Sequence, residues 1–136
     1  MWPMQLRHRW LWIGAALGLI VIGSAAGAIW SSRWQAERIA RVITSGDPTR
    51  AAMITRRYGC GGCHTIPGIP GADGQVGPPL AGLIHRVYIG GVAANSPDHL
   101  IQWIVEPRRF SPRSAMPVTG ISEAEARDVA AYLYTR

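Results

Sequence analysis

The stretch Cys60-Gly61-Gly62-Cys63-His64 decides how this chain folds. Its spacing is C-x-x-C-H, and it holds the only two cysteines among the 136 residues. Thiols at this spacing can reach the two vinyl groups on one edge of a porphyrin, and the adjacent histidine then lies under the iron. The motif therefore predicts covalent attachment of one haem c through Cys60 and Cys63, with His64 as an axial ligand.

Other uses of a cysteine pair explain the motif less well. A structural zinc site needs four Cys or His ligands at paired spacings, and no second pair follows in the sequence. A thioredoxin-like redox pair needs a βαβ setting, which the sequence around Cys60 does not show. A disulfide would close a very small loop and would leave His64 without a role.

Length and composition limit the kinds of partner. The chain is long enough for one small domain with an appendage, and its formal net charge is +6. All 14 basic residues are arginine, but they form no basic run or nucleic-acid recognition motif, so we predict no nucleic-acid partner. The charge suits a membrane surface or an acidic protein. We see no carboxylate pair in a plausible cleft, nucleophile–base pair or nucleotide loop, so we predict an electron carrier without a small-molecule substrate rather than an enzyme.

Residues 10–30 are predicted to form a transmembrane signal anchor. The stretch from Trp10 to Ile29 is almost entirely apolar or small. Twenty residues at about 1.5 Å per residue span roughly 30 Å, which is the thickness of the hydrocarbon layer. Tryptophans gather near the two ends, as they do at membrane interfaces: Trp10, Trp12, Trp30 and Trp34.

A cleaved signal peptide is the alternative interpretation of the same segment. Arg7 and Arg9 precede the apolar run, and small residues at 24–28 offer a cleavage site. The run is longer than a usual signal-peptide core, which favours a retained anchor. Because arginines flank both ends of the run, the charge rule does not decide its orientation.

Helix signals divide the remainder of the chain. Residues 31–44 continue as a helix until Ser45-Gly46-Asp47-Pro48 breaks it. A capping residue followed by proline predicts helices over 48–58 and from residue 97 to Pro107, and a capping box at Ser122–Glu125 predicts a helix to about residue 135. Residues 65–75 are rich in glycine and proline and predict a loop. We therefore expect a cytoplasmic N-terminus (1–9), the membrane segment (10–30), a connector (31–47) and a haem domain (48–136).

Two further stretches resemble the class I cytochromes c of the mitochondrial type. Gly77-Pro78-Pro79-Leu80-Ala81-Gly82-Leu83-Ile84-His85-Arg86 resembles their G-P-x-L-x-G-x-x-x-R segment. In residues 103–116, Pro107, Pro112 and Met116 fall on two prolines and a methionine of that family. The resemblance covers residues 48–136 and is closest to the small haem domains of bacterial respiratory haem-copper oxidases. It implies an all-α, class I cytochrome c fold, with N- and C-terminal helices crossing beside the covalent haem, preceded here by one transmembrane helix.

The resemblance also implies roles for residues outside the motif. The carbonyl of Pro78 would accept a hydrogen bond from the outer nitrogen of His64, which fixes the tautomer and keeps the ring basic. Arg86 would lie near a haem propionate, as would Ser114. Trp103 falls where the family has an aromatic side chain packed beside the haem.

Met116 is predicted to be the sixth ligand of the iron. Two of the four methionines precede the membrane segment, and Met53 lies too close before Cys60 to reach the opposite haem face. Met116 lies in a loop before a proline, where no packing pattern explains it. A bis-histidine site would instead use one of two other histidines, His85 or His99.

The chain departs from the family in two respects. The large aromatic residue expected one turn before the first cysteine is replaced by Thr55 and Arg56. The lysines that surround the haem edge in the family are represented only by arginines. Three of these precede Met116 and either steer an acidic partner or are ordinary solvated charges: Arg108, Arg109 and Arg113.

Coordination by His64 and Met116 would leave no open position on the iron and would raise its reduction potential relative to bis-histidine ligation. The resemblance thus implies one-electron transfer in a respiratory chain, to or within a terminal oxidase, with a quinol:cytochrome c reductase upstream. Because haem c is attached outside the bacterial cytoplasmic membrane, we expect a single-pass inner-membrane protein with a periplasmic haem domain and membrane lipid around its anchor. The alternatives are a haem c anchor subunit of a periplasmic dehydrogenase and a gas-binding or peroxidatic haem protein with a labile Met116.

Overall fold

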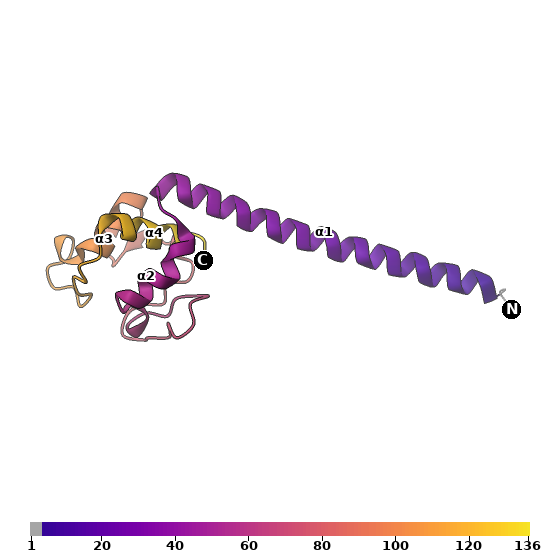
Figure 1. The fold of residues 1–136 in the computed structure, drawn as a ribbon, viewed down its shortest axis with the longest axis horizontal. Coiled ribbons are helices and arrows are strands. Elements are labelled where there is room, and N and C mark those ends of the chain that lie inside the picture. The colour runs from indigo at the N-terminus through magenta and orange to yellow at the C-terminus, as the bar shows by residue number, and fades with distance from the viewer. Residues whose placement is uncertain (1–3) are drawn as a thin grey trace. The chain divides into compact units, whose positions relative to one another are not determined.

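The computed structural model describes residues 4–136, with side chains from residue 11 onward. The chain divides into two units, one ending at Gln35 and one formed by Ala36–Arg136. The first unit consists of the greater part of the long helix α1 (Met4–Thr44). In the second unit, α4 (Glu123–Leu133) packs against α2 (Ala51–Arg57) and α3 (Pro97–Val105) (Figure 1).

Helix α1 runs through both the predicted membrane segment and the predicted connector. It contains one stretch long and apolar enough to cross a membrane, and none of that stretch is buried within the protein. A signal sequence has the same properties. The helix ends where the sequence predicts, because Ser45 takes a left-handed conformation (φ 55°) and Gly46 follows. The prediction for the N-terminus extends to residues 1–3, which lie outside the described residues.

The three predicted helix starts carry the expected caps. The carboxylate of Asp47 accepts a hydrogen bond from the Thr49 N–H (3.0 Å), and Ser96 Oγ accepts one from the His99 N–H (3.2 Å). Ser122 and Glu125 form the full capping box of α4. Several boundaries differ from the prediction: residues 48–50 form a 3₁₀ turn before α2, α2 ends at Arg57, α3 ends at Val105 and α4 ends at Leu133.

A short antiparallel hairpin was not predicted. Strands β1 (Tyr88–Ile89) and β2 (Ala93–Ala94) are two residues long each, too short for an alternating pattern to appear in the sequence. The turn between them depends on Gly90 and Gly91, which both have positive φ (55° and 75°).

The C-terminal helix crosses the start of the haem domain at very close range. A Cβ atom on Gly46 would collide with the backbone carbonyl of Arg127 in α4, so only glycine allows this approach. The adjacent face of α4 is built largely from small buried residues, and this also shortens the distance between backbones. The side chains buried on α4 are Ala126, Asp128, Val129, Ala130, Ala131, Tyr132 and Leu133.

Asp128 connects α4 to the chain that precedes α2. Its Oδ1 accepts a hydrogen bond from the Asp47 N–H (2.7 Å), and the Arg50 guanidinium lies 2.9 Å from Oδ2. The Arg50 contact compensates the charge but lacks hydrogen-bond geometry, so Oδ2 has no hydrogen-bond donor among the described residues. The preceding residue, Arg127, donates to the Thr44 carbonyl (3.2 Å).

A second polar contact joins the end of α2 to the start of α4. Glu125 accepts hydrogen bonds from the Arg57 guanidinium (2.8 Å) and from the Tyr58 hydroxyl (2.8 Å). The hydrogen bond from Tyr58 is the main cause that lowers the pKa of Glu125 below its ordinary value. Tyr58 lies two residues before Cys60, so this contact fixes where the chain leaves α2.

Replacing Gly46 with alanine should destabilise the domain by about 1–3 kcal/mol, because the new methyl group overlaps backbone atoms that cannot move independently. The measurement is chemical denaturation of the haem-loaded protein in detergent. Gly27→Ala is the matched control, since nothing lies within 4 Å of its added Cβ. Equal stability of both variants would contradict the crossing described above.

Glu125→Gln should change how stability depends on pH. The pKa of Glu125 is lowered on folding, so its ionised form adds stability that is fully present above the ordinary value of 4.5 and is lost as the pH falls through the lowered value. The difference in unfolding free energy between wild type and variant should therefore shrink in acid. Glu106→Gln serves as the control, and a difference for Glu125→Gln that is constant with pH would refute the prediction.

Candidate haem attachment site

The C-x-x-C-H motif forms a single tight turn after α2. Gly59 adopts a left-handed conformation (φ 68°), which lets the chain reverse into the 3₁₀ turn Cys60–Gly62. The Cys60 carbonyl accepts hydrogen bonds from the N–H groups of Cys63 (3.2 Å) and His64 (3.0 Å). Both cysteines are half-buried and neither is in a disulfide, so both thiols are available on one short turn beside His64.

The ring of His64 has one nitrogen engaged. Its Nδ1 lies 2.8 Å from the carbonyl oxygen of Pro78. A carbonyl can only accept, so Nδ1 carries a proton, and in the neutral ring the free lone pair is then on Nε2. This leaves Nε2 as the nitrogen that can bind iron, in the contact that the resemblance implies for Pro78.

Glycines bring the loop before Pro78 against the attachment turn. The Gly77 N–H donates to the Cys63 carbonyl (2.7 Å), and the Gly74 N–H donates to the Gly61 carbonyl (3.0 Å). A Cβ atom on Gly77 would collide with the His64 ring. In the sequence Gly77 is recognisable only as part of its motif, yet its lack of a side chain allows the loop to pack directly against the imidazole.

The donor set fits a covalently held haem. Burial raises the pKa of the Cys60 thiol, so it is not an exposed reactive thiolate. Among the described residues, no group of three or more His, Cys, Asp or Glu side chains gathers to hold a bare metal ion. Two free thiols on one turn and a histidine whose Nε2 has no hydrogen-bond partner among the described residues match the attachment of a porphyrin.

The side chain of Arg86 closes the loop that follows Pro78. Its guanidinium donates to the carbonyl oxygens of Pro79 and Ala81, the latter at 3.2 Å. The side chain is half-buried and lies in the segment where the resemblance expects a propionate partner. Its role toward a propionate stays a prediction.

Asn95 is a positioning residue that the sequence analysis did not identify. Its amide donates to the carbonyls of Leu83 (2.7 Å) and Arg86 (2.8 Å), and its Oδ1 accepts from the Tyr134 hydroxyl (2.9 Å). Burial raises the pKa of Tyr134 to about 12, so the phenol stays a donor at neutral pH. The partners of Asn95 lie 9 to 39 residues away in the sequence, so no local pattern could have revealed its role.

Trp103 lies half-buried on α3, with its ring centroid 6.0 Å from that of Phe110. Gly90 leaves room for the indole, because a Cβ there would overlap the Trp103 ring. His99 stands edge-on to Phe110, and its Nδ1 lies 2.9 Å from the Ala94 carbonyl. The hairpin and α3 thus hold the Trp103 ring against the Phe110 ring.

Met116 is half-buried in a loop without helix or strand. Ser114 shapes this loop, because its Oγ accepts a hydrogen bond from the Met116 N–H (3.2 Å) and its N–H donates to the Ser111 carbonyl (2.9 Å). Met53, by contrast, is exposed on α2. The assignments of Met116 as ligand and of Ser114 as propionate partner stay predictions.

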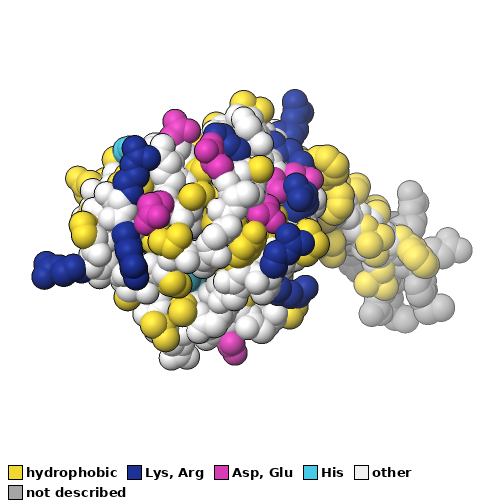
Figure 2. Space-filling view, turned by 60° about the vertical axis from the view of Figure 1, so that its left-hand side comes forward, with side chains coloured by type: hydrophobic (Ala, Val, Ile, Leu, Met, Phe, Trp, Pro, Cys, Tyr) yellow, Lys and Arg dark blue, Asp and Glu magenta, His cyan; other side chains and the backbone are white. Residues whose placement is uncertain are grey.

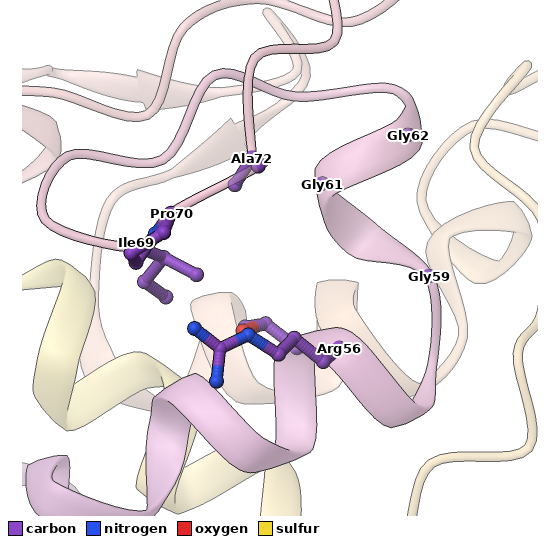
Figure 3. A pocket seen from close by; sticks show the side chains of 9 residues that line it. Arg56, Gly59, Gly61, Gly62, Ile69, Pro70 and Ala72 are labelled. Atoms are coloured by element: carbon purple, nitrogen blue, oxygen red, sulfur yellow. The ribbon is translucent and has the colours of Figure 1, made fainter.

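A cavity of about 200 Å³ borders the attachment turn. Figure 3 shows it between the end of α2, the glycines of the turn and the loop at Ile69–Ala72, with the Arg56 side chain extending toward Ile69 and Pro70. Thr55 is buried beside it, and its hydroxyl donates to the Ala51 carbonyl (2.8 Å). Thr55 and Arg56, which stand where the resemblance expects a large aromatic residue, therefore border this cavity without filling it.

Arg108, Arg109 and Arg113, which precede Met116, are all exposed. Exposure is required both for steering an acidic partner and for ordinary solvated charges. Figure 2 shows arginine side chains (dark blue) over several parts of one face, with acidic side chains (magenta) among them. Basic and acidic side chains are therefore interspersed on this face.

Comparison with known proteins agrees with this geometry. No curated protein and no solved structure matches the chain. The family model described as "Cytochrome c" matches residues 49–136, which is more than half of the chain and includes the motif with both cysteines. The domain therefore binds haem c covalently and transfers electrons, and it is not an enzyme by itself. On this evidence the chain belongs to the cytochrome c family.

Proposed function

We propose that this protein is a membrane-anchored monohaem electron carrier of a bacterial respiratory chain, which donates electrons to a terminal oxidase or forms part of one. The observation that carries the proposal is the His64 ring, whose Nδ1 is held by Pro78 while Nε2 stays free to bind iron. The exposed apolar stretch of α1 supports the anchor. In this proposal residues 10–30 span the inner membrane and the haem domain lies in the periplasm.

The residues of the site would keep the iron in a closed coordination sphere. When bound, the haem supplies a one-electron couple. Cys60 and Cys63 would hold its edge as thioethers, and the hydrogen bond to Pro78 would keep His64 in one tautomer and make Nε2 a stronger donor. Met116 would supply the second protein ligand, and its sulfur would favour a positive reduction potential. Arg86 and Ser114 would lie near the propionates, and Trp103 beside the ring.

A positive potential suits exchange with the late members of a respiratory chain. An upstream quinol:cytochrome c reductase would supply the electron, and the oxidase would accept it. The exposed arginines before Met116 suit an acidic docking surface, since complementary charge raises the rate of encounter more than the final affinity.

Replacing Met116 with leucine should open the iron to external ligands. We expect the variant to lose the long-wavelength band of sulfur-ligated ferric haem, to become partly high-spin and to bind carbon monoxide, whereas wild type does not bind it. Absorption spectra of the oxidised and reduced proteins, with and without carbon monoxide, measure this. Met53→Leu is the matched control and should behave as wild type. Rapid carbon monoxide binding by wild type would instead favour a gas-binding or peroxidatic protein.

The anchor is tested on the mature protein from its native membrane. We expect an intact mass that includes residues 10–30 plus one haem, and resistance to extraction by alkaline carbonate. A mass that corresponds to a chain beginning after the small residues at 24–28 would show that the segment is a cleaved signal peptide. The anchor would then be rejected. Mass spectrometry of subunits that co-purify in mild detergent separates an oxidase from a dehydrogenase as the partner.

A further inference from the structure

The haem-domain unit has a second cavity, which is larger than the one beside the attachment turn. It is an apolar cleft of about 370 Å³, and its described lining residues all belong to this one unit. Its walls come from three parts of the chain. The end of α1 contributes Ile39 and Ile43, a 3₁₀ turn contributes Ile84 and His85, and the C-terminal segment contributes Arg136.

Hydrogen bonds hold two of these walls together. The Gly82 N–H donates to the Arg136 carbonyl (2.9 Å), which ties the 3₁₀ turn to the C-terminal segment. The Asn95 side chain joins the same two segments, because it donates to the Leu83 carbonyl (2.7 Å) and accepts from the Tyr134 hydroxyl (2.9 Å). A binding partner would therefore meet a cleft that is already formed, and the cost of ordering it would not reduce the affinity.

The third wall, at the end of α1, carries apolar side chains at helix-packing spacing. Ala40 and Thr44 are buried in the core, so the rotation of this end of the helix is fixed. Ile39 and Ile43, which are four residues apart, line the cleft and remain 60% and 41% exposed, and Ile84 on the 3₁₀ turn is 42% exposed. Apolar side chains spaced by one helical turn are those that pack against a helix laid in a groove. Their exposure marks a contact with another molecule.

The charge at the cleft is basic. Arg136 and His85 line it, the exposed Arg38 precedes its α1 wall, and no acidic side chain is among the described residues that line it. Neither arginine makes a salt bridge within the described part of the chain. The Arg136 guanidinium stacks over the Tyr132 ring (4.5 Å), which engages its face and leaves its N–H edges for a carboxylate. The complementary occupant is therefore apolar and acidic.

We propose that this cleft binds an acidic amphipathic helix of a partner subunit. The apolar face of that helix packs on Ile39, Ile43 and Ile84, and one of its carboxylates pairs with Arg136. The inference rests on the proposed function and deepens it, because it makes the protein a bound subunit of a respiratory complex and not a free shuttle. The cleft lining includes no residue of the attachment turn or of the Met116 loop, so a partner held here leaves those residues uncovered.

The first test is site-specific photo-cross-linking of the full-length, haem-loaded protein in intact cells. A photoreactive benzoylphenylalanine replaces Ile84 in the cleft. In the matched control it replaces Val92, which is 53% exposed and does not line the cleft. The probe at position 84, and not the probe at position 92, should cross-link to one partner protein. Mass spectrometry should place the link in a segment that has apolar residues at helical spacing with Asp or Glu beside them.

Point variants then measure the apolar and the charged parts of the contact separately. The readout is the amount of the cross-linked partner that co-purifies in mild detergent. Ile84→Glu should lower it on the order of tenfold. Arg136→Gln should lower it about fivefold, the loss of one exposed ion pair worth about 1 kcal/mol, and Arg136→Lys should restore most of it. Val92→Glu and Arg108→Gln change exposed residues outside the lining and should behave as wild type. An unchanged haem spectrum shows that each variant is folded.

Several outcomes would overturn the helix site. A probe at position 84 that links to lipid, to a second copy of this chain or to a segment without carboxylates gives the cleft another occupant. A probe at position 84 that links no more than the control, or cleft variants that keep the partner as the controls do, removes the site altogether. The proposed function fails by different results, which are rapid carbon monoxide binding by wild type or a mature mass without residues 10–30. Neither of these depends on the cleft, so the two failures are distinguishable.

Discussion

The contact between Gly46 and the backbone of α4 is the constraint on which the haem domain depends. At Gly46 the chain passes so close to the Arg127 carbonyl that no side chain fits between them. Asp128 then reaches the Asp47 N–H, and Arg127 reaches the Thr44 carbonyl. Because α4 also packs on α2 and α3, this crossing joins the first and last parts of a domain that is small for a core of its own.

The same crossing positions the haem site through the polar contact at Glu125. By holding Arg57 and Tyr58, Glu125 fixes the end of α2 and hence the start of the attachment turn. Backbone hydrogen bonds from Gly74 and Gly77 then wrap the next loop around that turn, and they place the Pro78 carbonyl against His64. The start of the attachment turn therefore depends on α4, whereas the orientation of the His64 ring depends on the loop that follows the turn.

The structure also changes how the tether is understood. A connector over 31–47 suggests a separate segment between membrane and domain, yet Ala40 and Thr44 in α1 are buried in the haem-domain unit. The last turns of the helix are thus part of the domain core.

Local signals in the sequence determined the attachment motif, the long apolar helix, the break at residues 45–48 and the capped starts of α2, α3 and α4. Each depends on residues within one or two turns of one another, so spacing alone was enough. Only the tertiary structure decided that Gly77 lies against the His64 ring, that Asn95 joins the Arg86 segment to Tyr134, and that Ile39 and Ile84 form one cleft. These contacts follow no periodic pattern along the chain, and they form only when the loops and helices of the domain pack together.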